Sequence, residues 1–172
     1  DIGSFEMSET EITNAQYCEW LNLIFTKGDI AVTTMSVKCS KGINSDKEYF
    51  YLAGSIQSYP EASCWIIFDN GVFKTREGKE TWPVTWVTYY GALAFAQFYG
   101  FDLPREAEWE YACRGGKQYN FGTDSGSISI EKANYSDSKI NHPVSVKSYP
   151  ANPFGIYEMS GNVAEWCSDW QG

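Results

Sequence analysis

Apolar residues recur at helical intervals near the start of the chain, in the segment EITNAQYCEWLNLI (residues 11–24). Three of them share one helical face: Tyr17, Leu21 and Ile24. Thr13 and Gln16 have the spacing of a capping box, in which each residue satisfies a backbone N–H of the other. The pattern predicts a helix over residues 14–25 that ends near Gly28.

Two further segments carry helix start and stop signals. PVTWVTYYGALAFAQFYG passes from β-branched residues into an apolar run, so it predicts a short strand, a cap at Thr88 and a helix that ends at Gly100. LPREAEWEYACRGG has Pro104 at a helix entrance and closes with Gly115 and Gly116. We therefore expect one helix on each segment.

The hydrophobic pattern is weakest over residues 30–81, which combine polar residues with short apolar pieces such as YFYLAG. We interpret this segment as an elaboration on a core. Within it, WIIFDNGVFKT predicts a β-hairpin, because Asn70 and Gly71 adopt positive φ readily. Beyond Gly116 turn residues dominate, without an internal repeat. Together these patterns predict one irregular, loop-rich α+β domain over residues 1–172.

Aromatic residues and negative charge stand out in the composition. The 172 residues include 7 Trp, 12 Tyr and 10 Phe, which favours a fold packed by aromatic rings. A chain of this length can bury a core without needing a metal or a disulfide. The net charge of −9 argues against a nucleic-acid partner, since phosphate binding requires clustered Lys and Arg. A basic peptide, a cation or a merely solvated surface is compatible with this acidity.

Neither a membrane span nor a signal peptide is visible in the sequence. No segment approaches the roughly 18 apolar residues of a transmembrane helix. The chain begins with Asp1 rather than Met, which fits either a leader already removed or a fragment. We expect a secreted, periplasmic or cell-surface location in a bacterium.

The cysteines and the histidine show no metal-binding pattern. The five cysteines are Cys18, Cys39, Cys64, Cys113 and Cys167. Their number is odd, and none forms a C-x-x-C motif or a zinc-type spacing with histidine. The sequence leaves open one disulfide without identifying its members. His142 is the single histidine, so it cannot supply a multi-histidine iron or zinc site.

The stretch YEMSGNVAEWCSDW (residues 157–170) places Gly161 and Asn162 between aromatic and acidic residues. A helix through this stretch would carry the Gly-Asn pair in its middle, at a cost on the order of 1 kcal/mol relative to Ala. The alternation typical of a strand is also poor. The pattern therefore favours a tight turn that holds something in place.

Four stretches resemble one family in their order and spacing: ETEITNAQYCEWLN, WPVTWVTYYGALAFAQFYG, LPREAEWEYACRGG and SYPANPFGIYEMSGNVAEWCSDW. They are similar to the formylglycine-generating enzyme, or sulfatase-modifying factor, domain family. The resemblance spans about residues 5–170, apart from residues 30–81. It implies a variant of the C-type-lectin-like fold, which serves both catalytic and non-catalytic binding domains.

The resemblance implies a calcium site in the turn. Carried over by position, the ligands are the carbonyls of Glu158, Gly161 and Val163 and the side chain of Glu165. Ca²⁺ takes about six to eight oxygen ligands in irregular geometry, which suits such a turn. Three aromatic neighbours would pack the turn into the core: Tyr157, Trp166 and Trp170. In the alternative, Glu165 makes only a local cap or salt bridge and no metal binds.

The resemblance also implies a second calcium site, which would begin at Asn134 and the carbonyl of Tyr135, with Asp137 as a further ligand. Without a metal, the same stretch is a plain Asx-type turn. Residues 134–136 also form an N-glycosylation sequon, which has meaning only in a eukaryotic secretory context.

The family's oxidase converts the cysteine of a Cys-x-Pro-x-Arg segment in a sulfatase to formylglycine, using O₂ and a Cu⁺ ion held by two cysteines. Soft thiolates suit Cu⁺. In the family this pair follows an Arg-Gly-Gly-Ser stretch, whereas this chain ends at Gly172, so we expect the family's C-terminal segment to be missing. The cysteines present receive no catalytic role. Glu106 and Glu108 favour the positive end of a helix dipole over acid–base catalysis.

Two functions remain open. In the first, the chain is a family domain that lacks oxidase activity as given and belongs to an enzyme acting on the sulfatase peptide, if the parent protein carries the cysteine pair. In the second, it is a non-catalytic C-type-lectin-like binding or scaffold module for a protein, peptide or glycan.

Overall fold

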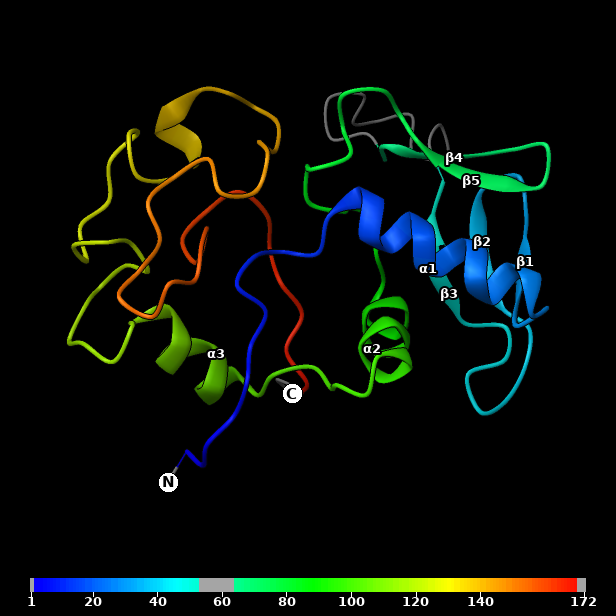
Figure 1. Cartoon of the computed structure of the whole chain (residues 1–172), viewed down its shortest axis with the longest axis horizontal. Coiled ribbons are helices and arrows are strands. Elements are labelled where there is room, and N and C mark those ends of the chain that lie inside the picture. The colour runs from blue at the N-terminus through cyan, green and yellow to red at the C-terminus, as the bar shows by residue number, and fades with distance from the viewer. Residues whose placement is uncertain (1, 53–63, 170–172) are drawn as a thin grey trace. The chain divides into compact units, whose positions relative to one another are not determined.

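The computed structural model of the chain describes residues 2–52 and 64–169 (Figure 1). It mixes helices and short strands with long irregular loops, as the sequence predicts. The chain divides into two compact units. We call Ile12–Asp102 the sheet unit, and Asp1–Glu11 together with Leu103–Gly172 the loop unit.

Helix α1 (Asn14–Thr26) opens the sheet unit and confirms the predicted helix. The Thr13 side chain accepts a hydrogen bond from the Gln16 N–H, and the Gln16 side chain accepts one from the Thr13 N–H at 2.9 Å. Lys27 is the C-cap residue that follows the helix, and the next residue, Gly28, has a φ of 70°. A capping box of this kind satisfies two of the backbone donors that every helix start leaves open.

Five strands follow α1 among the described residues. Strands β1 (Ile30–Val32), β2 (Ser36–Cys39) and β3 (Glu48–Tyr51) form an antiparallel sheet in that order. Strands β4 (Ile66–Asp69) and β5 (Val72–Thr75) form the predicted hairpin. Its turn residues Asn70 and Gly71 have φ values of 50° and 81°, the positive values that the sequence led us to expect.

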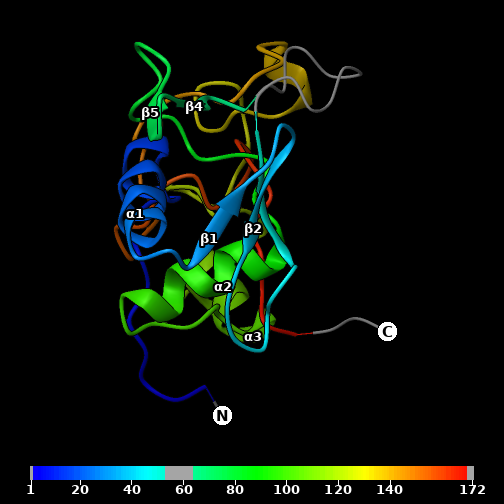
Figure 2. The ribbon, with the colours of Figure 1, turned by 90° about the vertical axis from the view of Figure 1, so that its right-hand side faces the viewer.

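The core of the sheet unit is built around aromatic rings. Helix α1 lies along β1 and β5 (Figure 1 and Figure 2) and contributes Tyr17 and Trp20, whose ring centroids are 4.9 Å apart. Residues 30–81, which we expected to be an elaboration, supply all five described strands and much of this core. Their fully buried hydrophobic side chains are Val37, Phe50, Ile66 and Phe73.

Helix α2 (Tyr89–Phe98) begins and ends as predicted. The Thr88 hydroxyl accepts a hydrogen bond from the Gly91 N–H at 3.1 Å, and Gly100 follows the helix with a φ of 83°. The strand predicted before α2 is reduced to two isolated bridges. Extended pairing fails there because Pro83 has no N–H to donate and Trp86 has a φ of 64°.

The loop unit contains helix α3 (Glu106–Cys113), again as predicted, and one short 3₁₀ helix, η2 (Ser136–Ser138). Its small core packs Ala112, Cys113 and Met159 against Trp109 and further apolar side chains. The described part of residues 157–170 contains neither helix nor strand, which confirms the predicted turn. Trp166 is 49% exposed, so the prediction that it packs the turn into the core is wrong, and Trp170 lies outside the described residues. No described helix has the length and apolar character needed to cross a bilayer.

Candidate functional site

Helix α3 presents Trp109 and Cys113 to the turn, and its start is secured from two directions. Arg105 stands at the cap position without a side-chain cap. Instead, the Glu108 carboxylate accepts a hydrogen bond from the Arg105 N–H at 2.8 Å, and the Asp169 carboxylate accepts one from the Glu106 N–H. Hydrogen bonds from Arg105 also lower the pKa of Glu108. These contacts support the prediction that Glu108 serves the helix start.

The turn itself depends on residues with positive φ. Glu158, Gly161 and Asn162 have φ values of 52°, 105° and 60°. Gly161 lies directly against the backbone of Asn134, because a Cβ placed on Gly161 would come within 2.3 Å of the Asn134 carbonyl oxygen. The same carbonyl accepts a hydrogen bond from the Asn162 N–H at 2.8 Å. The structure therefore brings together the two stretches in which the sequence predicts calcium ligands.

The side chain of Asn162 ties three separate segments to the turn. Its Nδ2 donates to Glu11 Oε2 at 3.0 Å and to the Val144 carbonyl at 3.2 Å. Its Oδ1 accepts from the Val144 N–H at 2.8 Å and from Asn134 Nδ2 at 3.3 Å. Both sides of the amide are thus used, which fixes the residue that lies between Gly161 and Val163.

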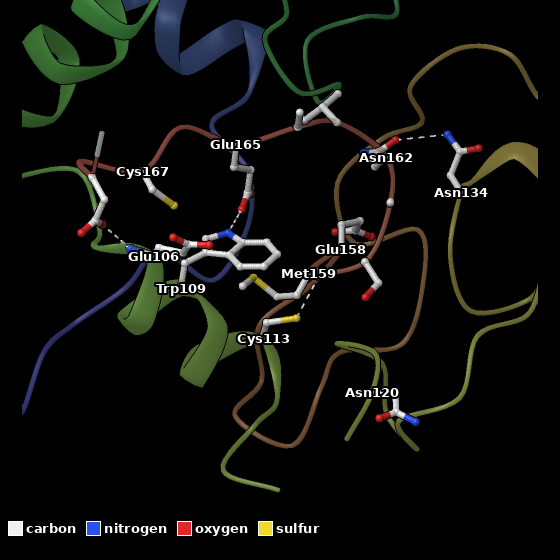
Figure 3. Close-up of a pocket in the computed structure, with 15 residues that line it drawn as sticks. Glu106, Trp109, Cys113, Asn120, Asn134, Glu158, Met159, Asn162, Glu165 and Cys167 are labelled. Carbon is white, nitrogen blue, oxygen red and sulfur yellow. Dashed lines mark hydrogen bonds between the residues drawn. The ribbon is translucent and has the colours of Figure 1, made fainter. Parts of the chain in front are cut away.

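A pocket of about 750 Å³ opens in front of the turn. Every residue from 158 to 165 lines it, and α3 contributes Glu106, Trp109 and Cys113 (Figure 3). The four residues predicted to hold calcium therefore face one common space. They share it with the indole of Trp109 and with sulfur atoms, so its lining is part polar and part apolar.

The predicted main-chain ligands have free acceptor capacity. Within residues 2–52 and 64–169, the carbonyl oxygens of Glu158, Gly161 and Val163 accept no protein hydrogen bond. Glu158 is buried, at 8% exposed, whereas Val163 is half-buried and Gly161 is exposed. The carbonyls of buried residues normally have a partner. A hard cation such as Ca²⁺ would supply one, and these oxygens fit such an ion chemically.

Glu165 is held by Trp109, whose indole Nε1–H donates to Glu165 Oε2 (Figure 3). The other carboxylate oxygen has no partner among the described residues. Burial of the carboxyl group raises the pKa of Glu165, even though the residue as a whole is exposed. The two observations agree if the carboxyl group is surrounded by pocket walls that remain open to solvent. One carboxylate oxygen thus remains available to a cation.

Glu158 uses its side chain differently from its carbonyl. Its carboxylate accepts hydrogen bonds from the Lys147 N–H at 3.0 Å and from the Tyr149 N–H at 3.2 Å. Burial nevertheless raises the pKa of this carboxyl group. Because the side chain is engaged by the backbone, the carbonyl of Glu158 is the group of this residue that we assign to the proposed ion.

The oxygens of the second predicted site already have protein donors. The Tyr135 carbonyl accepts hydrogen bonds from the N–H and the hydroxyl of Ser138, at 3.0 and 2.7 Å. Asn134 Oδ1 accepts from the same hydroxyl at 2.8 Å, and Asp137 is exposed. The sequon amide is occupied too, since Asn134 Nδ2 donates to the His142 carbonyl and to Asn162. A metal at this position stays a prediction.

Glu11 is a site residue that the sequence did not reveal. It is 6% exposed, and its Oε1 has no hydrogen-bond partner in the described part of the chain. Burial raises the pKa of Glu11 to about 8; the carboxyl groups of Glu165 and Glu158 act in the same direction, whereas hydrogen bonds from Asn162 and the Val163 backbone act against it. An acidic residue among polar neighbours gives no sign of burial. Only its contact with Asn162, 151 residues away in the sequence, identifies it.

The cysteines do not form a reactive group. None of the five is in a disulfide, and Cys167 is the least buried of them. Burial raises the pKa of Cys113 and of Cys167, and Cys113 Sγ donates to the Met159 carbonyl at 3.2 Å. A raised pKa disfavours the thiolate that a Cu⁺ ligand or a nucleophile requires. Among the described residues, no three His, Cys, Asp or Glu side chains form a metal-binding group.

Comparison with known proteins gives consistent matches. A family model described as the sulfatase-modifying factor enzyme 1-like domain matches residues 1–172. A serine/threonine-protein kinase pkn1 of Chlamydia caviae is 43% identical over 106 residues, covering 60% of this chain and 16% of that protein. A formylglycine-generating enzyme of Streptomyces coelicolor is 30% identical over 195 residues, covering 98% of this chain and 59% of the enzyme.

Among solved structures, PvdO from Pseudomonas aeruginosa matches with a TM-score of 0.46 and 24% identity, covering 83% of this chain and 69% of PvdO. The chain thus spans well under two thirds of the length of the curated relatives named above.

Proposed function

Because the chain belongs to the sulfatase-modifying factor enzyme 1-like domain family, we propose that it is a calcium-binding domain whose ion is held by the turn at residues 158–165. The ligands are the carbonyls of Glu158, Gly161 and Val163 and the carboxylate of Glu165. One observation carries this proposal. One pocket is lined by three residues whose carbonyls accept no hydrogen bond from residues 2–52 and 64–169, and by Glu165 with its half-engaged carboxylate.

The bound ion would hold the oxygens of this one turn together. Ca²⁺ accepts carbonyl and carboxylate oxygens at irregular angles, so it needs no regular secondary structure around it. A turn rich in positive φ has an unfavourable backbone conformation, which an ion bound to its carbonyls would help to offset. Calcium therefore acts here as a structural link that stabilises the loop unit.

The test is thermal unfolding with excess Ca²⁺ and with a chelator. A ligand that binds only the folded state stabilises it by about 2.7 kcal/mol at a hundredfold excess over Kd. For a chain of this size that corresponds to a melting temperature higher by roughly 5 to 10 °C. Glu165→Ala should lose most of this difference, whereas Glu6→Ala, at an exposed position of the same unit, should keep it. Equal melting temperatures of the wild type with and without Ca²⁺ would refute the proposal.

We also propose that the chain has no oxidase activity of its own. The raised pKa values of Cys113 and Cys167 support this, because they oppose the thiolate form. Incubated with Cu⁺ and O₂, the chain should leave the thiol of a Cys-x-Pro-x-Arg peptide intact, as mass spectrometry can establish. Formation of the aldehyde would contradict this. Within a longer protein that carries a copper-binding cysteine pair, the partner would be such a sulfatase peptide.

A second function is favoured by the match to the chlamydial protein. The matching segment of that protein is 43% identical to this chain, compared with 30% for the formylglycine-generating enzyme. The segment makes up only 16% of a protein named as a kinase. In this alternative the domain is a non-catalytic module that binds a protein, peptide or glycan. Saturable binding of the Cys-x-Pro-x-Arg peptide in a calorimeter would favour the enzyme-derived role, and its absence would favour the module.

The calcium proposal fits a location outside the cytoplasm: secreted, periplasmic or on the cell surface. Extracellular calcium modules bind their ion with dissociation constants of about 10⁻⁴ to 10⁻³ M, a range that the cytoplasm does not supply.

A further inference from the structure

Glu11 is a buried acidic residue without a basic partner. Its side chain is 6% exposed, and none of the ion pairs between described residues includes it. Oε2 accepts a hydrogen bond from Asn162 Nδ2, and the Val163 backbone also acts on the carboxyl group, but Oε1 has no hydrogen-bond partner among the described residues. A buried carboxylate without compensating charge is costly, so such a group is either protonated or located near a cation.

Two neighbouring carboxyl groups make an ionised Glu11 still less favourable unless a cation is present. The carboxyl groups of Glu165 and Glu158 both act on Glu11 with like charge. All three belong to, or contact, the turn at residues 158–165. A divalent ion at this turn would reverse the balance, because its two positive charges would attract all three carboxylates at once.

Asn162 connects Glu11 to the part of the turn that carries two of the proposed ligands. It lies between Gly161 and Val163, both of which offer a carbonyl to the proposed ion. The amide that accepts from Val144 and donates to Glu11 therefore also fixes the peptide units on either side of it. Glu11 is not among the residues that line the pocket, so it would act on the site through Asn162 and not as a ligand.

We propose that Glu11 is a positioning and charge-balancing residue of the calcium site, which holds Asn162 in place and supplies a second negative charge close to the ion. This inference rests on the proposed function. It assigns to the site a residue from the N-terminal segment of the chain, remote in sequence from the ligands. It also explains why an acidic side chain is buried where no Lys or Arg of the described residues forms an ion pair with it.

The charge and the hydrogen bond can be separated by substitution. Glu11→Gln keeps the length of the side chain and an oxygen that can accept from Asn162 Nδ2, but it removes the charge. Glu11→Asp keeps the charge on a shorter side chain. Glu6→Gln removes one negative charge from an exposed position of the same segment and serves as the matched control.

The experiment is titration of the four metal-free proteins with Ca²⁺ in a calorimeter, together with their melting temperatures without metal. Removing one charge near a divalent ion should weaken Ca²⁺ binding by Glu11→Gln at least about tenfold. Glu6→Gln should stay within about twofold of the wild type, and Glu11→Asp should bind more tightly than Glu11→Gln. Without metal, Glu11→Gln should melt no lower than the wild type.

The outcomes distinguish the two proposals. If the wild type does not bind Ca²⁺, the proposed function fails. If the wild type and Glu11→Gln bind with the same affinity, the role of Glu11 alone is overturned. Failure of Glu11→Gln to fold without metal would also overturn it, because the proposal requires the charge only when the ion is bound.

Discussion

At the scale of single residues, Gly161 is the position where the turn tolerates least change. A Cβ there would come within 2.3 Å of the Asn134 carbonyl oxygen, and the residue has a φ of 105°. Gly155 also has positive φ, 80°, but a Cβ on this residue would meet no atom within 4 Å. Both glycines therefore need a positive φ, but only at Gly161 would a Cβ also collide with a neighbouring atom.

We expect Gly161→Ala to destabilise the chain by about 3 kcal/mol or more, since left-handed backbone costs roughly 1 to 2 kcal/mol and the clash adds to it. Gly155→Ala should cost only about 1 kcal/mol, because the positive φ is unfavourable for Ala but no clash is added. Urea unfolding of both variants measures the difference. Equal losses in the two variants would show that the turn does not press against Asn134.

Glu11 makes stability depend on pH when no metal is bound. Burial raises its pKa from the usual 4.5 to about 8, so folding favours the protonated form. Its stabilising contribution is complete below pH 4.5 and is lost as the pH rises through about 8. Burial raises the pKa of Glu158 and Glu165 as well, and their contributions have the same sign.

Unfolding of the metal-free chain should therefore require less urea at pH 8.5 than at pH 6. Glu11→Gln, which cannot ionise, should show a shallower decline over this range. Excess Ca²⁺ should flatten the decline in the wild type, because the ion favours the ionised carboxylates. Parallel declines in the wild type and Glu11→Gln would contradict the assignment of this dependence to Glu11.

The sequence identified the turn residues through the resemblance of their motif, but it could not identify Glu11. The proposed ligands lie within one short stretch, and the resemblance supplied their positions. The contact between Glu11 and Asn162 joins opposite ends of the sequence. No local signal encodes such a pairing, since burial of a single side chain depends on the whole fold.

At the scale of secondary structure, α3 illustrates a cap that comes from a distant segment. Arg105 cannot cap the helix with an oxygen, and the Asp169 carboxylate accepts the Glu106 N–H in its place. Ser168 adds a backbone hydrogen bond to the Pro104 carbonyl at 2.8 Å. The segment after the turn thus secures the start of α3, which in turn carries Trp109 to the pocket.

Asp169→Ala should destabilise the chain by about 1 kcal/mol, the usual cost of a lost N-terminal cap. Asp137→Ala, an exposed acidic residue of η2 in the same unit, should cost less than about 0.5 kcal/mol. Chemical unfolding of both variants tests this. A loss at Asp137 as large as at Asp169 would mean that the α3 cap has no particular role.

Three helices and the β4–β5 hairpin were predictable because their signals are local. Caps at Thr13 and Thr88, the glycine stops and the Asn70-Gly71 turn all act within a few residues. The sheet of β1, β2 and β3 was not predictable in detail. Its strands have three or four residues and include a register shift between Val37 and Lys38, so their alternation is too short to read.

At the scale of the whole molecule, the family and its mixed fold follow from motifs that lie in both units. The α1, α2 and hairpin segments belong to the sheet unit, whereas α3 and the turn belong to the loop unit. The fold class was therefore accessible from the sequence, while the division into two compact units was not. Contacts between segments distant in the chain define such units, and periodicity does not report them.

The central claim is that the turn at residues 158–165 holds a calcium ion through main-chain oxygens and Glu165. Anomalous diffraction from crystals grown with Ca²⁺ tests it most directly. We predict a peak about 2.3 to 2.6 Å from the carbonyl oxygens of Glu158, Gly161 and Val163 and from the Glu165 carboxylate. Crystals saturated with Ca²⁺ that show no peak at the turn, with these oxygens directed away from one another, would contradict the account.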